Sequence, residues 1–284
     1  MKFKNIAVIP NEKKDPFFEH TKNLINYLSE ADINIFINEI YQQKINNCVL
    51  KYTDDENLYK SCDLLIALGG DGTMLRTAAR ASRSDKPVIG VNLGRIGFMS
   101  EIELHEINLF ERLFSGEYTV KNRMMIDVEI IKDTGELKIS PALNDAVITN
   151  GVGARLIDID LFCDDVKITH YRADGVILAT PTGSTGYSMS AGGPIIDPNI
   201  ACLCVTPICP HSLISRPIIF SHDSVLEVRN KNAETEVYLT TDGQTIKLDE
   251  GDIVRVKKSR FTAKLISVKN HGFFDVIREK ISEN

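Results

Sequence analysis

The sequence predicts an α/β protein whose first part is a parallel-sheet domain and whose second part is a mostly antiparallel β domain. Up to about residue 120, apolar strand patterns alternate with helical patterns, which is typical of a parallel sheet covered by helices. Beyond that point, turn signals separate short β-prone segments, which favours antiparallel pairing. We therefore expect an α/β domain over residues 1–120, a β domain over 121–265, and a C-terminal segment, 266–284, that packs back on the first domain.

The elements of the first domain follow from apolar runs and their spacing. Residues 64–68 are a continuous apolar run that ends at glycine, the pattern of a buried strand. Residues 17–29 place Phe17, Leu24 and Ile25 on one side of a helix. By the same criteria we expect strands over residues 6–9, 33–37 and 88–91, and helices over 73–82 and 104–113.

The second domain is rich in turn signals, among them Asp174-Gly175 and Asp242-Gly243. Its C-terminal continuation, residues 273–281, has the pattern of a short amphipathic helix. The expected strands cover residues 125–131, 146–149, 156–162, 176–180, 202–206, 225–228, 236–240 and 252–257.

The composition excludes several functional classes. With 43% hydrophobic and 25% charged residues among 284, the chain has the make-up of an ordinary soluble globular protein. Its net charge of −6 gives no broad electrostatic case for nucleic acid or an anionic membrane, and it lacks an apolar run long enough to span one. The six cysteines form no Cys-x-x-Cys pair, so we expect reduced thiols in a cytoplasmic protein and no zinc site.

The run Gly69-Gly70-Asp71-Gly72-Thr73 is the most informative feature of the first domain. It separates the strand at 64–68 from the helix at 73–82, for which Thr73 is the expected N-cap. Glycines at such a turn let the backbone approach a ligand, and a helix N-terminus offers N–H groups to phosphate. Asp71 would then handle a hydroxyl proton or a metal beside the phosphates. The alternative is an ordinary Asp-Gly turn without chemistry.

A second group of unusual residues lies in the β domain, between residues 171 and 198. The loop at 180–194 is rich in hydroxyls and glycines and nearly free of charge. Such groups can contact ribose, phosphate and the edges of adenine, and Tyr187 offers an aromatic face to a base. The alternative is a Ser/Gly-rich surface loop, but the apolar Ile195-Ile196 and the prolines at 181, 194 and 198 argue against a flexible linker.

Weaker candidates come from isolated residues. The amide and carboxylate of Asn144-Asp145 could read an adenine edge and hold a ribose hydroxyl, or could form a plain turn. Arg155 and Arg172 could hold pyrophosphate, although most arginines are solvated surface residues. The sequence contains neither a P-loop nor a Gly-x-Gly-x-x-Gly dinucleotide fingerprint at its first helix, and the protein-kinase signatures are absent too.

Taken together, these segments resemble a known family. Gly69–Thr73 resembles the Gly-Gly-Asp-Gly motif shared by NAD kinases, diacylglycerol-type lipid kinases and 6-phosphofructokinases, and the match runs from about residue 5 to 250 in order and spacing. The segments that single out the bacterial NAD kinases are Asn92-Leu93-Gly94-Arg95-Ile96-Gly97-Phe98, Asn144-Asp145, Thr180–Tyr187 with Gly192-Gly193-Pro194, Ser215-Arg216-Pro217 and Asp242-Gly243-Gln244.

The resemblance implies an activity and its requirements. It implies transfer of the γ-phosphoryl group of ATP to the 2′-hydroxyl of the adenosine ribose of NAD, giving NADP, with a divalent ion, most simply Mg²⁺, on the donor. It also implies a homodimer or homotetramer with NAD and ATP as its partners, and neither nucleic acid nor a membrane.

By position, the resemblance also implies roles for single residues. Asp71 matches the catalytic aspartate and Gly72 the glycine beside it, while Gly69, Gly70 and Thr73 complete the phosphate turn. Asn144 and Asp145 match a pair that holds the adenosine portion, although many members have Glu at the second position. The loop residues that match adenosine-binding positions are Thr185, Gly186 (alanine in many members), Tyr187, Ser188 and Ser190. Asp174 matches a residue that contacts the nicotinamide end, and Arg172 lies two residues before it. Arg155 and Gln244 match more variable binding positions.

The expected mechanism gives Asp71 the role of base. A carboxylate is a far weaker base than an alkoxide, so Asp71 would orient the hydroxyl and accept its proton late, which a loose phosphoryl-transfer transition state allows. A lipid kinase and a non-catalytic dinucleotide sensor are the alternatives; the adenosine-type loop argues against the first and the presence of Asp71 against the second. Donor preference, acceptance of NADH and inhibition by NADPH stay open.

Overall fold

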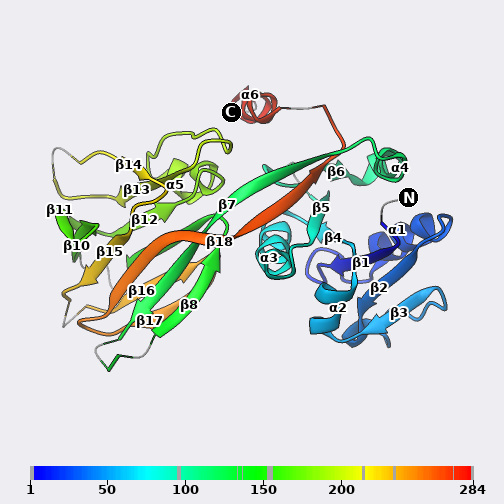
Figure 1. Cartoon of the computed structure of the whole chain (residues 1–284), viewed down its shortest axis with the longest axis horizontal. Coiled ribbons are helices and arrows are strands. Elements are labelled where there is room, and N and C mark those ends of the chain that lie inside the picture. Colours follow the sequence, from blue (N-terminus) through cyan, green and yellow to red (C-terminus); the bar gives the residue numbers. More distant parts are fainter. Residues whose placement is uncertain are drawn as a thin grey trace. The chain divides into compact units, whose positions relative to one another are not determined.

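The computed structural model describes residues 3–94, 97–132, 134–135, 137–151, 156–212, 215–232, 235–270 and 272–282. Its chain divides into two compact units. The first unit combines Met1–Asn122 with Thr262–Asn284, and the second unit is Arg123–Phe261. Figure 1 labels the helices and strands of both. The predicted fold class, with parallel pairing in the first part and antiparallel pairing in the second, is confirmed.

The first unit is built on a parallel sheet whose strands follow the order β5-β4-β1-β2-β3. The end of the long strand β18 (Ile253–Ser267) pairs with β5 in parallel, which places a late segment of the chain in this sheet. The other strands are β1 (Asn5–Pro10), β2 (Asn34–Asn38), β3 (Leu50–Thr53), β4 (Leu64–Gly69), β5 (Pro87–Asn92) and the short β6 (Ile102–Glu103) beside β5.

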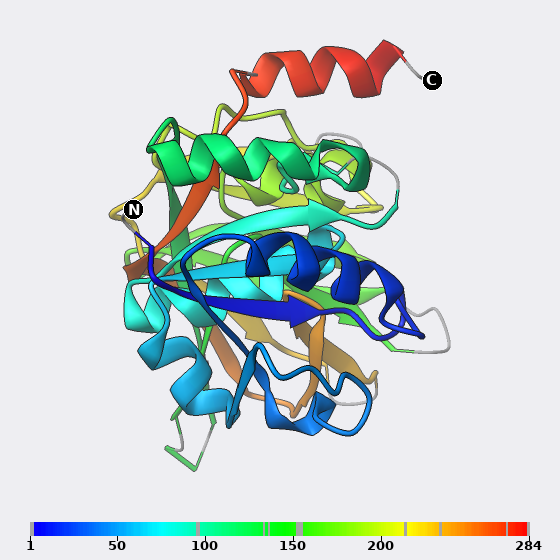
Figure 2. The ribbon, with the colours of Figure 1, turned by 90° about the vertical axis from the view of Figure 1, so that its right-hand side faces the viewer.

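Helices cover both faces of this sheet because its strands are apolar on both. Ile89 and Val91 of β5 belong to one core cluster with Leu24 and Ile25 of α1 (Glu19–Ser29), and Figure 2 shows α1 on the near face. Gly90 points the other way, and a Cβ there would lie 3.2 Å from the sulfur of Met74 in α3 (Asp71–Ala81). The remaining helical segments are η1 (Glu39–Tyr41), α2 (Asp55–Ser61), η2 (Ser82–Ser84), η3 (Leu104–Leu109), α4 (Phe110–Ser115) and α6 (Phe273–Ser282).

The start of α1 differs from the prediction. Asp15 is buried and accepts hydrogen bonds from the backbone N–H of His20 (3.3 Å) and Thr21 (2.8 Å), so the helix begins at Glu19. Phe18 adopts a left-handed conformation and is buried, whereas Phe17 is 76% exposed. The expectation that Phe17 lies on the buried side of the helix is therefore wrong. The run at 104–113 is helical as expected, but its first part is a 3₁₀ segment.

The second unit consists of two antiparallel sheets with one core between them. One sheet has the order β11-β10-β15-β18, with β7 beside β18 and β8 beside β7; the other has the order β14-β13-β12-β9-β16-β17. The strand bounds are β7 (Thr119–Ile131), β8 (Leu137–Ala142), β9 (Asp145–Asn150), β10 (Ile157–Cys163), β11 (Val166–Ala173), β12 (Gly175–Ala179), β13 (Cys202–Ile208), β14 (Ile218–Ser221), β15 (Leu226–Asn230), β16 (Val237–Thr241) and β17 (Gln244–Leu248).

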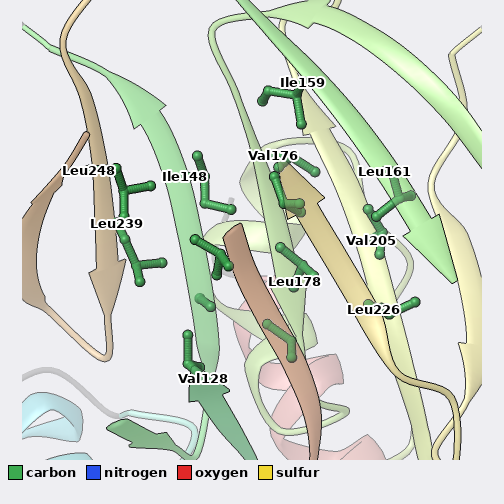
Figure 3. Close-up of a cluster of buried hydrophobic side chains, with 14 of the residues drawn as sticks. Val128, Ile148, Ile159, Leu161, Val176, Leu178, Val205, Leu226, Leu239 and Leu248 are labelled. Carbon is green, nitrogen blue, oxygen red and sulfur yellow. The ribbon is translucent and has the colours of Figure 1, made fainter. Parts of the chain in front are cut away.

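The core of the second unit comes from alternate residues of both sheets. Leu161 and Val228 of the first sheet pack in one buried cluster with Ile148, Val176 and Leu239 of the second. Figure 3 labels Leu161, Ile148, Val176 and Leu239 of this cluster. This packing fixes β9, β12 and β16 side by side. In the described part of the chain, no helix is long and apolar enough to cross a membrane.

Candidate active site: a phosphate turn and a nucleoside loop

The glycine turn follows β4, whose six residues are all buried. Gly70 is the N-cap of α3, and its carbonyl oxygen accepts hydrogen bonds from the N–H of Thr73 (2.8 Å) and Met74 (3.0 Å). The helix therefore begins at Asp71, and the prediction that Thr73 caps it is wrong. The Thr73 hydroxyl instead accepts a hydrogen bond from the side-chain amide of Asn11 (2.7 Å), which ties the loop after β1 to this turn.

The Asp71 carboxylate is held by a neighbouring loop. Its two oxygens accept hydrogen bonds from the backbone N–H of Phe98 (2.8 Å) and Met99 (3.2 Å). A Cβ at Gly97 would overlap this carboxylate, so the glycine is what allows the loop to come so close. Asp71 thus stands at the N-terminus of α3 with a fixed orientation, and each oxygen keeps a lone pair for a ligand.

The described residues of the Asn92–Phe98 segment, which the family resemblance singled out, lie beside this turn. The N–H of Leu93 donates to the carbonyl oxygen of Gly69 (2.6 Å), and the Asn92 side chain donates to the carbonyl oxygen of Gly94 (2.8 Å). The other side-chain atom, Oδ1 of Asn92, is buried and has no hydrogen-bond partner among the described residues. Arg95 lies outside the described residues. The turns after β4 and β5 thus meet at the carboxyl edge of the sheet, where parallel α/β sheets bind ligands.

The Asn144-Asp145 pair occupies the start of β9 in the second unit. Because β9 runs antiparallel to both neighbours, its first residues lie beside the ends of β12 and β16. Asp145 is opposite Ala179, and Ala146 is opposite Thr241. The sheet therefore brings together three segments that the sequence separates: the Asn144-Asp145 pair, the loop after β12 and the turn after β16.

Asp242 holds this junction in place, a role that the hairpin-turn interpretation missed. Its carboxylate accepts hydrogen bonds from the backbone N–H of Leu143 (2.7 Å), Asn144 (3.0 Å) and Asp145 (3.2 Å). Burial raises the pKa of Asp242, although these three hydrogen bonds oppose the rise. Burial and, second, the charge of Asp242 raise the pKa of Asp145 to about 7. Asp145 is therefore a carboxyl group that can donate as well as accept a hydrogen bond near neutral pH.

The loop after β12 is fastened to the same pair. Thr180 donates from its backbone N–H to the carbonyl oxygen of Asn144 (2.8 Å) and from its hydroxyl to that of Leu143 (2.6 Å). A Cβ at Gly183 would overlap the backbone of Asn144, so this position needs glycine. The side-chain oxygen of Asn144 is buried and unpaired in the described structure. A buried acceptor without a partner is what a ligand-binding amide would show in the absence of its ligand.

The hydroxyls of the loop have different surroundings. The loop forms η4 (Gly183–Thr185) and α5 (Tyr187–Ser190). Tyr187, which is 46% exposed, and Ser190 point outward, whereas Ser188 is fully buried and its hydroxyl bonds that of Thr206 (2.9 Å). Thr185 is buried and donates to the carbonyl oxygen of Thr182 (3.3 Å). The Ser188 hydroxyl is therefore already hydrogen-bonded inside the unit, and the role of Ser188 in ligand binding stays a prediction.

Of the remaining predicted residues, Asp174, Arg172 and Gln244 lie on other segments of the second unit. Asp174 directly precedes β12, at the opposite end of that strand from Thr180, and is not brought together with Asn144. Arg172 is exposed on β11, and Gln244 is exposed at the first position of β17, two residues after Asp242. Arg155 lies outside the described residues.

The chain thus carries two features expected of a phosphotransferase that acts on a nucleotide: a glycine turn with a fixed carboxylate in the first unit, and a polar loop with an unpaired amide in the second. The comparisons with known proteins agree. Residues 6–118 match the family model "ATP-NAD kinase N-terminal domain", and residues 143–268 match "ATP-NAD kinase C-terminal domain". The chain belongs to the ATP-NAD kinase family, and its activity is that of an NAD kinase.

Relatives and solved structures support this assignment over the whole chain. The chain is 43% identical to an NAD kinase of Thermoanaerobacter sp. (strain X514) and 37% identical to that of Natranaerobius thermophilus, covering 99% and 98% of each chain respectively. It is similar to the yeast NADH kinase crystallised with NADH (TM-score 0.87, 29% identity, 98% of this chain and 86% of that one). It is also similar to an NAD kinase from Archaeoglobus fulgidus crystallised with ATP (TM-score 0.73, 26% identity, 99% of both chains).

Proposed function

We propose that Asp71 is the catalytic residue of an NAD kinase that transfers the γ-phosphoryl group of ATP to the 2′-hydroxyl of the adenosine ribose of NAD. The bond between the γ-phosphorus and the bridging oxygen breaks, ADP leaves with its electron pair, and the ribose oxygen forms the new bond. Asp71 orients the hydroxyl and accepts its proton late in the transfer. The observation that carries this role is the carboxylate at the start of α3, fixed by the N–H groups of Phe98 and Met99.

The turn itself supplies the site for the donor phosphates. Gly69, Gly70, Gly72 and Thr73 place backbone at the N-terminus of an eleven-residue helix, where N–H groups and the helix dipole favour an anion. These groups stabilise the charge that spreads over the transferring phosphoryl oxygens.

A divalent ion would be held mainly by the phosphates of the ATP donor. In the described part of the chain, no group of three or more His, Cys, Asp or Glu side chains could hold a metal ion. Mg²⁺ keeps several waters and needs only one or two carboxylates besides the phosphates, so an ion that arrives with ATP can be held mainly by the phosphates of ATP. When bound, the ion would neutralise phosphate charge; no dedicated protein cage is required.

Asn144 and Asp145 are the residues proposed to hold the adenosine portion of NAD. The Asn144 amide offers a donor and an acceptor, the pattern that pairs with an adenine edge. Asp145, with its raised pKa, can donate to or accept from a ribose hydroxyl. Thr185, Gly186, Tyr187, Ser188 and Ser190 complete this group, and Ser188 also supports the loop from inside the unit through Thr206. Asp174 is proposed to contact the nicotinamide end, Arg172 the pyrophosphate, and Arg155 and Gln244 more variable parts of the ligand.

Assembly and location follow from the family resemblance and the cysteines. We expect a homodimer or homotetramer that works in the cytoplasm. All six cysteines are free, which suits a reducing compartment. Sedimentation of the purified chain over a range of concentrations measures the oligomeric state.

The decisive experiment replaces the carboxylate of Asp71. Wild-type protein with ATP, Mg²⁺ and NAD should form NADP, and NADH is tested beside NAD as acceptor. Asp71→Asn should lower kcat by about 1,000-fold or more while NAD binding and the melting temperature stay close to wild type. Asp32→Asn, at a fully solvated site in the same unit, is the control and should leave kcat unchanged. A near-normal kcat in Asp71→Asn would falsify the catalytic role.

A further inference from the structure

The amino group of Lys14 lies over the phosphate turn, although the sequence pattern gave Lys14 no role. Its Nζ atom lies so close to Gly70 that a Cβ at that position would clash with it, and it lies 3.3 Å from where a Cβ at Gly94 would be. The two glycines belong to the turns after β4 and β5, and Lys14 belongs to the loop after β1. These three strands are neighbours in the sheet, so their carboxyl ends share one edge. The ammonium thus stands at the edge where the donor phosphates are expected.

The backbone that carries Lys14 is anchored on both sides. Asn11 accepts hydrogen bonds from the N–H of Lys14 with its carbonyl oxygen (3.0 Å) and its side-chain oxygen (3.3 Å), and its side-chain nitrogen donates to Thr73. Asp15, the next residue, is buried and caps α1. Asn11 therefore connects the loop of Lys14 directly to the Gly69–Thr73 turn, and Lys14 does not sit on a free-standing surface loop.

The Lys14 ammonium has no protein partner that would explain its position. Among the described residues, no hydrogen bond or ion pair of its Nζ atom is present, and the side chain is exposed. Other lysines of this unit do pair with carboxylates, for example Lys44 with Glu12 and Lys264 with Asp85. An unpaired cation above glycines at a helix N-terminus matches the needs of a multiply charged anion.

We propose that Lys14 is a further catalytic residue, which binds the terminal phosphates of the donor at the Gly69–Thr73 turn. This inference rests on the proposed function. As a compact positive charge, the ammonium would neutralise negative charge on the transferring group and on the departing ADP. It keeps its proton throughout; the proton of the acceptor hydroxyl still goes to Asp71 and then to solvent. ATP and inorganic polyphosphate share this chemistry, because both present terminal phosphates.

The test compares Lys14→Met with Lys14→Arg and with the neighbour Lys13→Met. Removing one charged donor at the transferring group should lower kcat/KM for ATP by about 100-fold or more. Lys14→Arg, which keeps the charge, should recover most of it, and Lys13→Met should match wild type. Calorimetric titration should show weakened binding of a Mg²⁺-loaded, non-hydrolysable ATP analogue and unchanged binding of NAD.

The outcomes separate this inference from the proposed function. NADP formation by the wild-type protein tests the function by itself. A Lys14→Met variant that keeps kcat/KM for ATP and analogue affinity within about threefold of wild type overturns the inference alone. The fall in kcat/KM should be similar with every phosphate donor that the wild-type enzyme uses, tripolyphosphate included. A loss confined to ATP would place the ammonium on the nucleoside and would also overturn it.

Discussion

The carboxylate of Asp242 accepts a hydrogen bond from the backbone N–H of Asn144 over 3.0 Å, although 98 residues separate the two in sequence. The same carboxylate receives the N–H groups of Leu143 and Asp145. Asp242 is thus a positioning residue: it fixes the backbone from which the proposed adenosine-binding side chains project.

Replacing Asp242 by asparagine should weaken NAD binding without touching the chemistry. An amide has one acceptor oxygen and would turn its NH₂ group toward at least one of the three N–H donors, which leaves that donor unpaired. We expect KM for NAD to rise about 10-fold or more, a fall in stability of about 1–3 kcal/mol, and little change in kcat. Asp165→Asn is the matched control, since Asp165 is also an aspartate in a left-handed turn but is exposed. An equal effect in both variants would argue against a positioning role.

Asp145 should make the stability of the fold depend on pH. In the folded chain its pKa is raised to about 7 by burial and by Asp242, whereas in the unfolded chain it is that of an ordinary aspartate, about 3.9. Between these values the folded state holds a proton that the unfolded state has lost. The contribution of Asp145 is therefore fully present below about pH 4, declines as the pH rises to about 7, and is constant above that.

The variant Asp145→Asn measures this contribution. Urea unfolding of wild type and variant at several pH values gives the difference in free energy of unfolding. As the pH rises from about 4 to 7, the free energy of unfolding of the wild type should fall relative to that of the variant. A difference that is flat over this range, or that moves in favour of the wild type, would show that Asp145 is charged in the fold.

Gly97→Ala should disable Asp71, the proposed catalytic aspartate, although the two residues are 26 positions apart in sequence. The added Cβ would overlap the Asp71 carboxylate, so either the carboxylate turns away or the loop moves and breaks the hydrogen bonds of Phe98 and Met99. We expect kcat to fall by about 100-fold, in line with misplacement of a reacting group by an ångström. Gly272→Ala, where a Cβ would meet its nearest neighbour at an ordinary 3.4 Å, should keep wild-type kcat.

Two glycines of the loop after β12, Gly183 and Gly186, should differ in how well they tolerate replacement by alanine. At Gly186 a Cβ would lie 3.3 Å from the carbonyl oxygen of Gly183 and 3.8 Å from the Asn144 side chain, so a shift of a few tenths of an ångström admits it. At Gly183 the Cβ would overlap the Asn144 backbone, which cannot give way. Gly186→Ala should change KM for NAD less than about threefold, whereas Gly183→Ala should lower the melting temperature by several degrees and weaken NAD binding about 10-fold or more. Similar KM values for both variants would refute this account.

The local sequence pattern was sufficient to predict the helices and strands whose apolar residues form the core. The strand predicted over 64–68 is β4, because an apolar run of that length is buried on both faces of the sheet. Two neighbours were missed: β3 is short and half-exposed, and α2 has only seven residues. The Asp54 side chain, which caps α2 by accepting from the N–H of Asn57, was a signal that could have revealed that helix.

The site was predictable as a set of segments but not as a set of contacts. Asp71, Asn144 and Asp145 were proposed as site residues from motifs, yet their orientation depends on residues far away in sequence. The hydrogen bond from the Asn11 side chain to the Thr73 hydroxyl joins residues 62 positions apart, and no local sequence pattern predicts it. Ser188 illustrates the same point, because its hydroxyl lies beside Thr206 only once the two segments are folded together.

If Asn144 holds adenine as proposed, its buried amide oxygen would give the enzyme a means of choosing between bases. A site that leaves a polar atom unpaired when the right group is missing can discriminate by factors of about 10,000. In its proposed role, Asn144 pairs with the amino group of adenine, which deamination replaces by a carbonyl oxygen. Two acceptors would then face each other in a place that water does not reach. A deaminated dinucleotide would then be refused at its base, and damaged cofactor would not enter the phosphorylated pool.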